Sequence, residues 1–124
     1  MLPNEKMDSD AMRNEKAVTK EILEYLNSLP GCLAYKRHAG PNRKGKPDIT
    51  GCLNGKRLEI EVKTGKNKPT ALQKKWLKNW YNAGAISGCV WSLLDAVKLI
   101  VGNKTCEQKI KEFKLWKKNR AIRR

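Results

Sequence analysis

The spacing of apolar residues near the N-terminus predicts a helix over residues 9–29. Its apolar positions recur at intervals of three, four and seven residues, which is the period of one helix face. These positions are Ala11, Val18, Ile22, Leu26 and Leu29. Pro30 and Gly31 end this helix. A short strand is expected over residues 32–37, followed by a basic loop over residues 38–46 that is rich in glycine and proline.

Two strands joined by a tight turn are predicted next. Residues 48–53 lead to Asn54-Gly55, a dipeptide typical of a two-residue hairpin turn, and residues 57–63 return with strict alternation. Alternate side chains of a strand point to opposite faces. One face carries the apolar residues Leu58, Ile60 and Val62. The other face carries Arg57, Glu59, Glu61 and Lys63.

A second helix is expected from Thr70 to Gly84. Thr70-x-x-Gln73 is a capping-box pattern, and glycine is a common residue just after a helix. The apolar stripe of this helix consists of Leu72, Trp76, Leu77 and Trp80. We expect the two tryptophans to pack in the core. The alternatives are that they stack on nucleic-acid bases together with Tyr81, or that the aromatic surface belongs to a dimer interface.

The last part of the chain predicts a strand and two further helices. Residues 85–91 read as a short buried strand, Ser92 caps a helix that runs to about Val101, and Thr105 opens a final basic helix. The order of elements is therefore α-β-β-β-α-β-α, followed by a basic C-terminal helix. This order predicts an α/β fold with a mixed central sheet flanked by helices.

The composition indicates which class of partner the protein binds. The 124 residues are enough for one domain, and we divide them into a flexible tail over residues 1–10, a folded domain over residues 11–102 and a basic helical extension over residues 103–124. The 27 Lys and Arg residues outnumber the 12 Asp and Glu residues, which gives a net charge of +15 and a pI near 9.9. A domain this basic is expected to bind a polyanion. A merely soluble surface is the alternative.

Other features narrow the compartment and the cofactors. No apolar run approaches the roughly 18 residues of a membrane span, and the first ten residues hold no apolar signal segment. No membrane association and a cytoplasmic location are expected. The four cysteines form no C-x-x-C pair, and the chain has one histidine, His38, so a structural zinc site is not expected. Buried free thiols are expected instead, in particular at Cys52 and Cys89.

The hairpin brings candidate chemistry together. A two-residue turn places Asp48 directly opposite Glu61, with Cβ atoms roughly 5 Å apart on one face, and Lys63 shares that face. Two carboxylates this close repel each other, and Mg²⁺ offsets the repulsion while leaving positions for water and phosphate oxygens. An adjacent ammonium can orient an attacking water. The pattern predicts metal-assisted phosphodiester hydrolysis. The alternative is the solvent-exposed face of an amphipathic hairpin.

These residues resemble a known family. Pro47-Asp48, followed after a hairpin by Glu61-Val62-Lys63, is similar to the PD-(D/E)XK nuclease superfamily. The stretch GKPDITGCLNGKRLEIEVKTGKNKPTALQKKWLKNWYNAGA looks more narrowly like the virus-type replication-repair nuclease (VRR-NUC) family, and the likeness spans roughly residues 13–97. The resemblance implies a restriction-endonuclease-like core. It also implies that Mg²⁺ or Mn²⁺ is bound by Asp48, Glu61 and the backbone carbonyl of Val62, and that Lys63 positions the attacking water.

The resemblance also implies two further catalytic residues. Gln73 matches the family glutamine on the helix after the hairpin; a capping role with Thr70 is its alternative and does not exclude the first. Glu15 matches a glutamate on the first helix that reaches the metal directly or through water. Helical geometry places Glu15 on the core-facing side of that helix, although exposure to water at a frayed helix end is the alternative. The chain departs from the family pattern at Thr19, where glutamine is more usual.

The basic loops beside Asp48 are expected to hold DNA phosphates. The candidate contacts are Arg37, Arg43, Lys44 and Lys46 before Asp48, and Lys66 and Lys68 after Lys63. A mobile basic loop without this role is the alternative, and His38 is not included in the catalytic set.

The specific function expected from the resemblance is that of stand-alone family members, which resemble Holliday junction resolvases acting on branched DNA as homodimers. Two other functions stay open: a nucleic-acid-binding module without catalysis, and a nickase or flap endonuclease.

Overall fold

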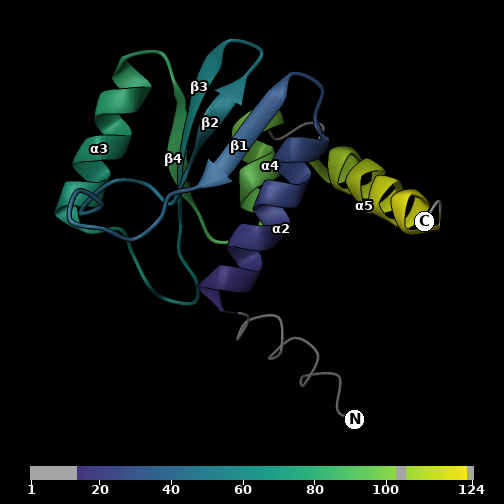
Figure 1. The fold of residues 1–124 in the computed structure, drawn as a ribbon, viewed down its shortest axis with the longest axis horizontal. Coiled ribbons are helices and arrows are strands. Elements are labelled where there is room, and N and C mark those ends of the chain that lie inside the picture. The colour runs from purple at the N-terminus through teal and green to yellow at the C-terminus, as the bar shows by residue number, and fades with distance from the viewer. Residues whose placement is uncertain (1–13, 103–105, 123–124) are drawn as a thin grey trace.

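A four-stranded mixed sheet forms the centre of the fold (Figure 1). The computed structural model describes residues 14–102 and 106–122. The strands lie in the order β1-β2-β3-β4; β1, β2 and β3 are antiparallel neighbours, and β4 runs parallel to β3. Their bounds are β1 Cys32–Lys36, β2 Ile49–Leu53, β3 Lys56–Val62 and β4 Ile86–Val90.

The hairpin between β2 and β3 has the predicted register. Asn54 and Gly55 have φ values of 48° and 87°, and positive φ at both central residues is the geometry of a type I′ turn. Leu53 pairs with Lys56, and Thr50 pairs with Glu59. The two-residue turn inferred from Asn54-Gly55 is therefore confirmed, and with it the alignment of the two strands.

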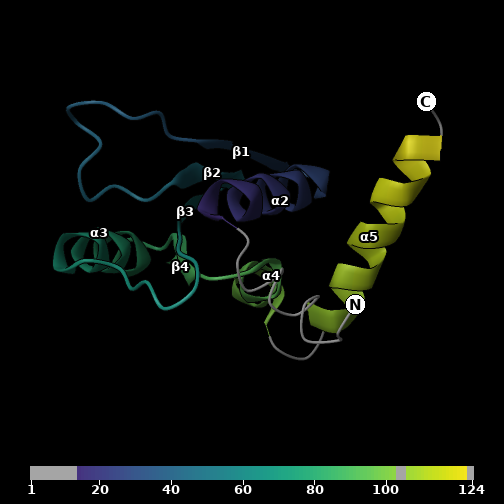
Figure 2. The ribbon, with the colours of Figure 1, turned by 90° about the horizontal axis from the view of Figure 1, so that it is seen from below.

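Helices cover both faces of the sheet. They are α2 Glu15–Ser28, α3 Ala71–Asn82, α4 Leu93–Val101 and α5 Cys106–Ile122. Figure 2 shows α3 on one side of the sheet and α2 and α4 on the other. The side with α2 and α4 holds the main core, where Leu58, Ile60 and Val62 are buried. The predicted mixed α/β architecture is confirmed.

The structure describes the N-terminal helix α2 from Glu15 to Ser28, within the predicted range of residues 9–29. Asn14 is its N-cap, because the Asn14 side chain accepts a hydrogen bond from the Ala17 N–H at 2.8 Å. The predicted start at residue 9 and the predicted tail over residues 1–10 lie outside the described residues. Thr105, the predicted start of the last helix, also lies outside them.

An aromatic contact helps to pack the basic C-terminal helix onto the domain. Phe113 of α5 is 4% exposed and belongs to the core. Its ring meets the ring of Tyr25 of α2 edge-on, with centroids 5.4 Å apart. Beyond this contact, α5 projects past the sheet (Figure 1).

The prediction of buried thiols is wrong for the cysteines whose side chains are described. Cys52 is exposed, Cys32 and Cys89 are half-buried, and all three are free. For Cys52 the reason is that α3 contacts β3 and β4, whereas Leu33 and Tyr35 of β1 remain exposed on the same face as Cys52. The side chain of Cys106 lies outside the described residues.

Candidate active site

Asp48 and Glu61 lie against each other, as the hairpin register predicts. The Asp48 N–H donates to Glu61 Oε1 at 3.1 Å, and the Val62 N–H donates to Asp48 Oδ2 at 3.1 Å. Asp48 is 9% exposed and Glu61 is 2% exposed. The alternative of a solvent-exposed polar face is therefore wrong at these two carboxylates.

Lys63 and Gln73 converge on one oxygen of Glu61. Lys63 Nζ lies 3.3 Å from Glu61 Oε2, and Gln73 Nε2 donates to the same oxygen at 2.8 Å. The Oε1 atom of Gln73 accepts from the Thr70 N–H at 2.8 Å, and the Gln73 N–H donates to Thr70 Oγ1 at 3.2 Å. Gln73 thus completes the predicted capping box of α3 and contacts the carboxylate of Glu61 at the same time.

Burial changes the acidity of Glu61. Removal from water raises the pKa of this carboxyl group from 4.5 to about 7, and the neighbouring Asp48 adds to the increase. The ammonium of Lys63 acts in the opposite direction. Two adjacent buried carboxylates form a site that a divalent cation would stabilise, because the cation can take the place of the Lys63 and Arg43 side chains that compensate their charge in this structure.

The backbone of β3 adds a third oxygen to the same side. The N–H and C=O of one residue in a strand point toward the same neighbouring strand. Since the Val62 N–H donates to Asp48, the Val62 carbonyl faces Asp48, whereas the Lys63 N–H donates to Val90 O of β4 at 2.9 Å. Two carboxylates and one carbonyl are oxygen ligands of the kind that Mg²⁺ and Mn²⁺ prefer, so these residues fit the expected metal.

Glu15 is not brought into this group. Among residues 14–102 and 106–122, no three His, Cys, Asp or Glu side chains form a metal-binding group. Glu15 is half-buried at the start of α2, and its carbonyl accepts from the Thr19 hydroxyl at 2.7 Å. A contact between Glu15 and the metal, directly or through water, stays a prediction.

The loop before β2 reaches the site through Arg43. The guanidinium of Arg43 pairs with Asp48 Oδ1 and donates to the Lys46 carbonyl. Arg43 thus contacts the carboxylate that is one of the proposed metal ligands. Lys46 is half-buried in the same loop, and Lys44 is exposed there.

The aromatic stripe of α3 supports this loop instead of the core. Leu77 is the buried residue of α3, whereas Trp76 and Trp80 are half-buried. Gly45, with φ of 78°, lies so close to α3 that a Cβ atom there would be 2.9 Å from Trp76 Cδ1. The guanidinium of Arg57 lies 4.2 Å from the ring centroid of Trp80. The expectation that both tryptophans pack in the core is wrong, because α3 uses them to contact Gly45 and Arg57.

Arg37 has an internal role that the sequence did not reveal. Its Nη1 lies 2.7 Å from Glu59 Oε1, and its Nη2 donates to Glu59 Oε2 at 3.2 Å. Nη1 also donates to the Pro47 carbonyl at 2.8 Å, and the Arg37 N–H donates to the Asp48 carbonyl at 2.7 Å. Arg37 therefore holds the backbone around Asp48, and its predicted phosphate contact stays a prediction.

Glu59 is the buried residue that sequence reasoning missed. It is fully buried and is contacted by Arg37, by the Thr50 hydroxyl and by Arg57, whose Nε lies 3.0 Å from Oε2. The hairpin register already placed Glu59 opposite Thr50. The alternation of polar and apolar residues does not show, however, that this face of the hairpin is buried. The position of Cys89 beside the site was not foreseen either: it is paired in register with Glu61, and burial and that carboxylate raise the pKa of its thiol to about 11.

The remaining candidate contacts lie on exposed loops. Lys66 and Lys68 are exposed after Lys63, and His38 is exposed on the loop before β2. None of the helices within the described ranges combines the length and apolar character needed to cross a bilayer. A search with the sequence finds no matching family model and no matching curated protein.

Proposed function

We propose that this protein is a metal-dependent DNA endonuclease that hydrolyses phosphodiester bonds, with a restriction-endonuclease-like core of the VRR-NUC type. The observation that carries the proposal is the buried pair of Asp48 and Glu61, with Lys63 Nζ 3.3 Å from Glu61 Oε2. The order of elements and the position of the hairpin support the fold assignment.

The proposed chemistry divides among a few residues. Asp48, Glu61 and the Val62 carbonyl would hold Mg²⁺ or Mn²⁺. When bound, such an ion supplies positive charge for the scissile phosphate and lowers the pKa of a coordinated water. The Lys63 ammonium orients the attacking water, and Gln73 keeps Glu61 in place through its hydrogen bond. The cationic loop around Arg43 faces the phosphate backbone.

The expected substrate is branched DNA, in particular a four-way junction, and the expected active form is a homodimer. The net charge of +15 supports a polyanionic substrate. Leu33 and Tyr35, which are 75% and 59% exposed on the edge strand β1, supply an apolar surface on which a second copy can pack. Two active sites related by a two-fold axis suit symmetric incision of a junction.

A cleavage assay tests the proposal. A labelled four-way junction, a flap and a linear duplex are incubated with the protein in Mg²⁺ or in EDTA, and sedimentation gives the oligomeric state. We expect cleavage only with Mg²⁺, fastest on the junction. Asp48→Ala and Lys63→Ala should still bind DNA but cut it at least roughly a hundredfold more slowly. Lys56→Ala, at an exposed lysine of the hairpin turn, is the matched control and should cut normally.

Each alternative has its own result in this assay. Binding that survives EDTA without any cleavage, and that is unchanged in Asp48→Ala, indicates a non-catalytic binding module. Faster cleavage of flaps or linear duplex than of junctions indicates a nuclease of other specificity. A stable monomer at working concentration contradicts the resolvase assignment.

A further inference from the structure

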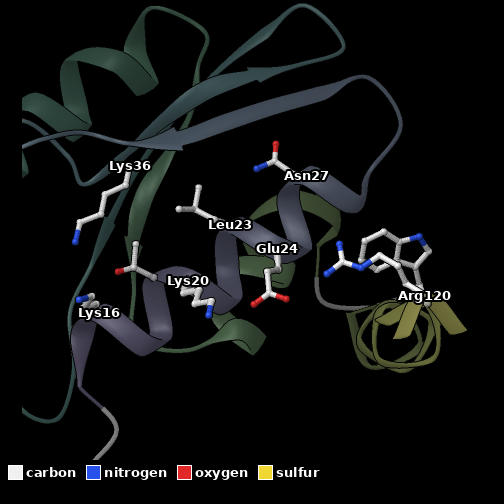
Figure 3. A pocket seen from close by; sticks show the side chains of 9 residues that line it. Lys16, Lys20, Leu23, Glu24, Asn27, Lys36 and Arg120 are labelled. Carbon is white, nitrogen blue, oxygen red and sulfur yellow. The ribbon is translucent and has the colours of Figure 1, made fainter. Parts of the chain in front are cut away.

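A basic groove lies between α2, β1 and α5 (Figure 3). It is on the α2 side of the sheet, whereas α3, which carries Gln73 of the candidate active site, lies on the other side (Figure 2). Its volume is about 460 Å³. One wall is a stripe along α2, whose successive members are one, three or four residues apart and so lie on one side of the helix. The residues of this stripe are Lys16, Lys20, Leu23, Glu24 and Asn27. Lys36 of β1 and Trp116 and Arg120 of α5 form the other walls.

The walls of the groove are held by specific contacts. The side-chain amide of Asn27 donates to the Ala34 carbonyl and accepts from the Ala34 N–H, both at 2.9 Å, which ties α2 to β1. The contact of Phe113 with Tyr25 ties α5 to α2. Because contacts among three elements fix it, the groove is formed before any ligand binds.

The charge in the groove is strongly positive. Among the residues that the structure describes, four cationic side chains line it, from Lys16, Lys20, Lys36 and Arg120, against the single carboxylate of Glu24. That carboxylate is already paired, because Lys117 Nζ lies 3.5 Å from Glu24 Oε2. The site is therefore complementary to an anion that extends across several cations and not to a single small ion.

An aromatic ring lies beside one of these cations, Arg120. The Trp116 ring stacks on Phe113, with centroids 6.1 Å apart, and the Arg120 guanidinium lies 4.8 Å from its centroid. The ring is nevertheless 38% exposed. Cations that follow a backbone, combined with an aromatic ring on which a base can stack, are the features by which proteins bind single nucleic-acid strands. A lipid surface or an acidic peptide has no bases to use this ring.

The groove also begins close to the catalytic end of the sheet. Lys36 is the last residue of β1 and pairs with Ile49, the residue after Asp48. A strand that leaves the candidate active site can therefore pass around this end of the sheet and enter the groove on the other face. A continuous rigid duplex does not make this turn, whereas an unpaired strand or the arm of a branched molecule does.

We propose that this groove binds a nucleic-acid strand, with its phosphates on Lys16, Lys20, Lys36 and Arg120 and a base against the exposed part of the Trp116 ring. The proposal rests on the proposed nuclease function and specifies its substrate: DNA with an unpaired or branched strand that extends beyond the scissile phosphate.

Binding measured in EDTA tests the groove separately from catalysis. A fluorescein-labelled single strand is titrated with the full chain by anisotropy at several salt concentrations. Lys20→Ala combined with Arg120→Ala should weaken binding roughly tenfold and lower the slope of log affinity against log salt by about 1.4, because two phosphate contacts are lost. The control combines Lys56→Ala with Lys98→Ala, which removes the same charge from two exposed lysines outside the groove. An equal effect of both pairs overturns the proposal.

Two further measurements keep the test independent of folding defects. Trp116→Leu should weaken binding to the single strand about tenfold, whereas Trp116→Phe should keep most of the affinity; melting curves verify that the variants are folded. With the unaltered chain, photo-crosslinking to iodouracil-containing DNA should label Trp116. Crosslinks found only outside the groove overturn the proposal. It also fails if the groove variants lose binding to phosphatidylserine vesicles while their affinity for DNA is unchanged.

Failure of the nuclease proposal has a different signature. If the protein never cuts in Mg²⁺ but binds the single strand through the groove, the nuclease proposal is contradicted and the groove proposal is supported. If the protein cuts junctions at the same rate with and without the groove substitutions, the nuclease proposal is supported and the groove proposal is contradicted.

Discussion

Gln73 donates a hydrogen bond to Glu61 Oε2 at 2.8 Å from the first turn of α3. The same side chain caps the helix at Thr70. The start of α3 and the orientation of Glu61, a proposed metal ligand, therefore depend on one residue. Its Oε1 atom contacts the Thr70 N–H and its Nε2 atom contacts Glu61.

Separate substitutions distinguish these two contacts. Thr70→Ala removes the side-chain half of the cap and should lower the free energy of unfolding by about 1 kcal/mol with little effect on cleavage. Gln73→Ala also releases Glu61 and should slow cleavage by roughly tenfold or more. Urea denaturation and kcat/KM measure the two effects. Equal losses of activity in both variants would mean that Gln73 acts only through the helix cap.

The raised pKa of Glu61 predicts a pH dependence of stability. In the metal-free protein this carboxyl group has a pKa of about 7, above its ordinary value of 4.5. Between these two pH values the folded state binds more protons than the unfolded state, so the free energy of unfolding should fall as the pH rises from about 4.5 to about 7. Glu61→Gln should flatten this decline. Urea denaturation in EDTA across this range measures it, and parallel profiles for both proteins would contradict the prediction.

Arg37 should affect stability more than DNA binding. Arg37→Ala removes one of the positive charges that compensate the carboxylate of the fully buried Glu59. Removing one partner of a buried ion pair lowers the free energy of unfolding by roughly 3 kcal/mol. Lys44→Ala, at an exposed position of the following loop, should weaken DNA binding at low salt and leave the stability unchanged. Denaturation and anisotropy titrations of both variants check this contrast. Loss of DNA affinity without loss of stability in Arg37→Ala would restore the predicted phosphate contact.

The close approach of Gly45 to α3 predicts a sensitive position in the loop. Gly45→Ala places a Cβ atom against Trp76 and Leu72 at a positive φ, and we expect a cost of roughly 1–3 kcal/mol together with slower cleavage as the loop moves away from Asp48. Gly40→Ala is the matched control, because a Cβ there meets no atom within 4 Å. Similar effects of the two substitutions would show that packing against α3 does not determine the position of the loop.

The central part of the candidate site could be predicted from the sequence because local rules determine it. Asn54-Gly55 favours a two-residue turn, and the turn together with strict alternation places Asp48 opposite Glu61 and Lys63 on the same face. Thr70 and Gln73 define the start of α3 through a contact three residues apart. Each of these inferences uses residues close in sequence or paired across one hairpin.

The other features of the site depend on contacts between segments that are distant in the sequence. Alternation shows that Glu59 and Glu61 share a face, but only the packing of α3 and the approach of Arg37 decide that this face is buried. The same packing moves Trp76 and Trp80 away from the core and leaves Cys52 exposed. Glu15 is not joined to the two buried carboxylates, because its helix position does not determine how α2 lies against the sheet. Thus the sequence by itself determined the helices, the strands and the pairing of Asp48 with Glu61, whereas the burial of that pair and the groove formed by α5 were decided by tertiary packing, which local patterns do not encode.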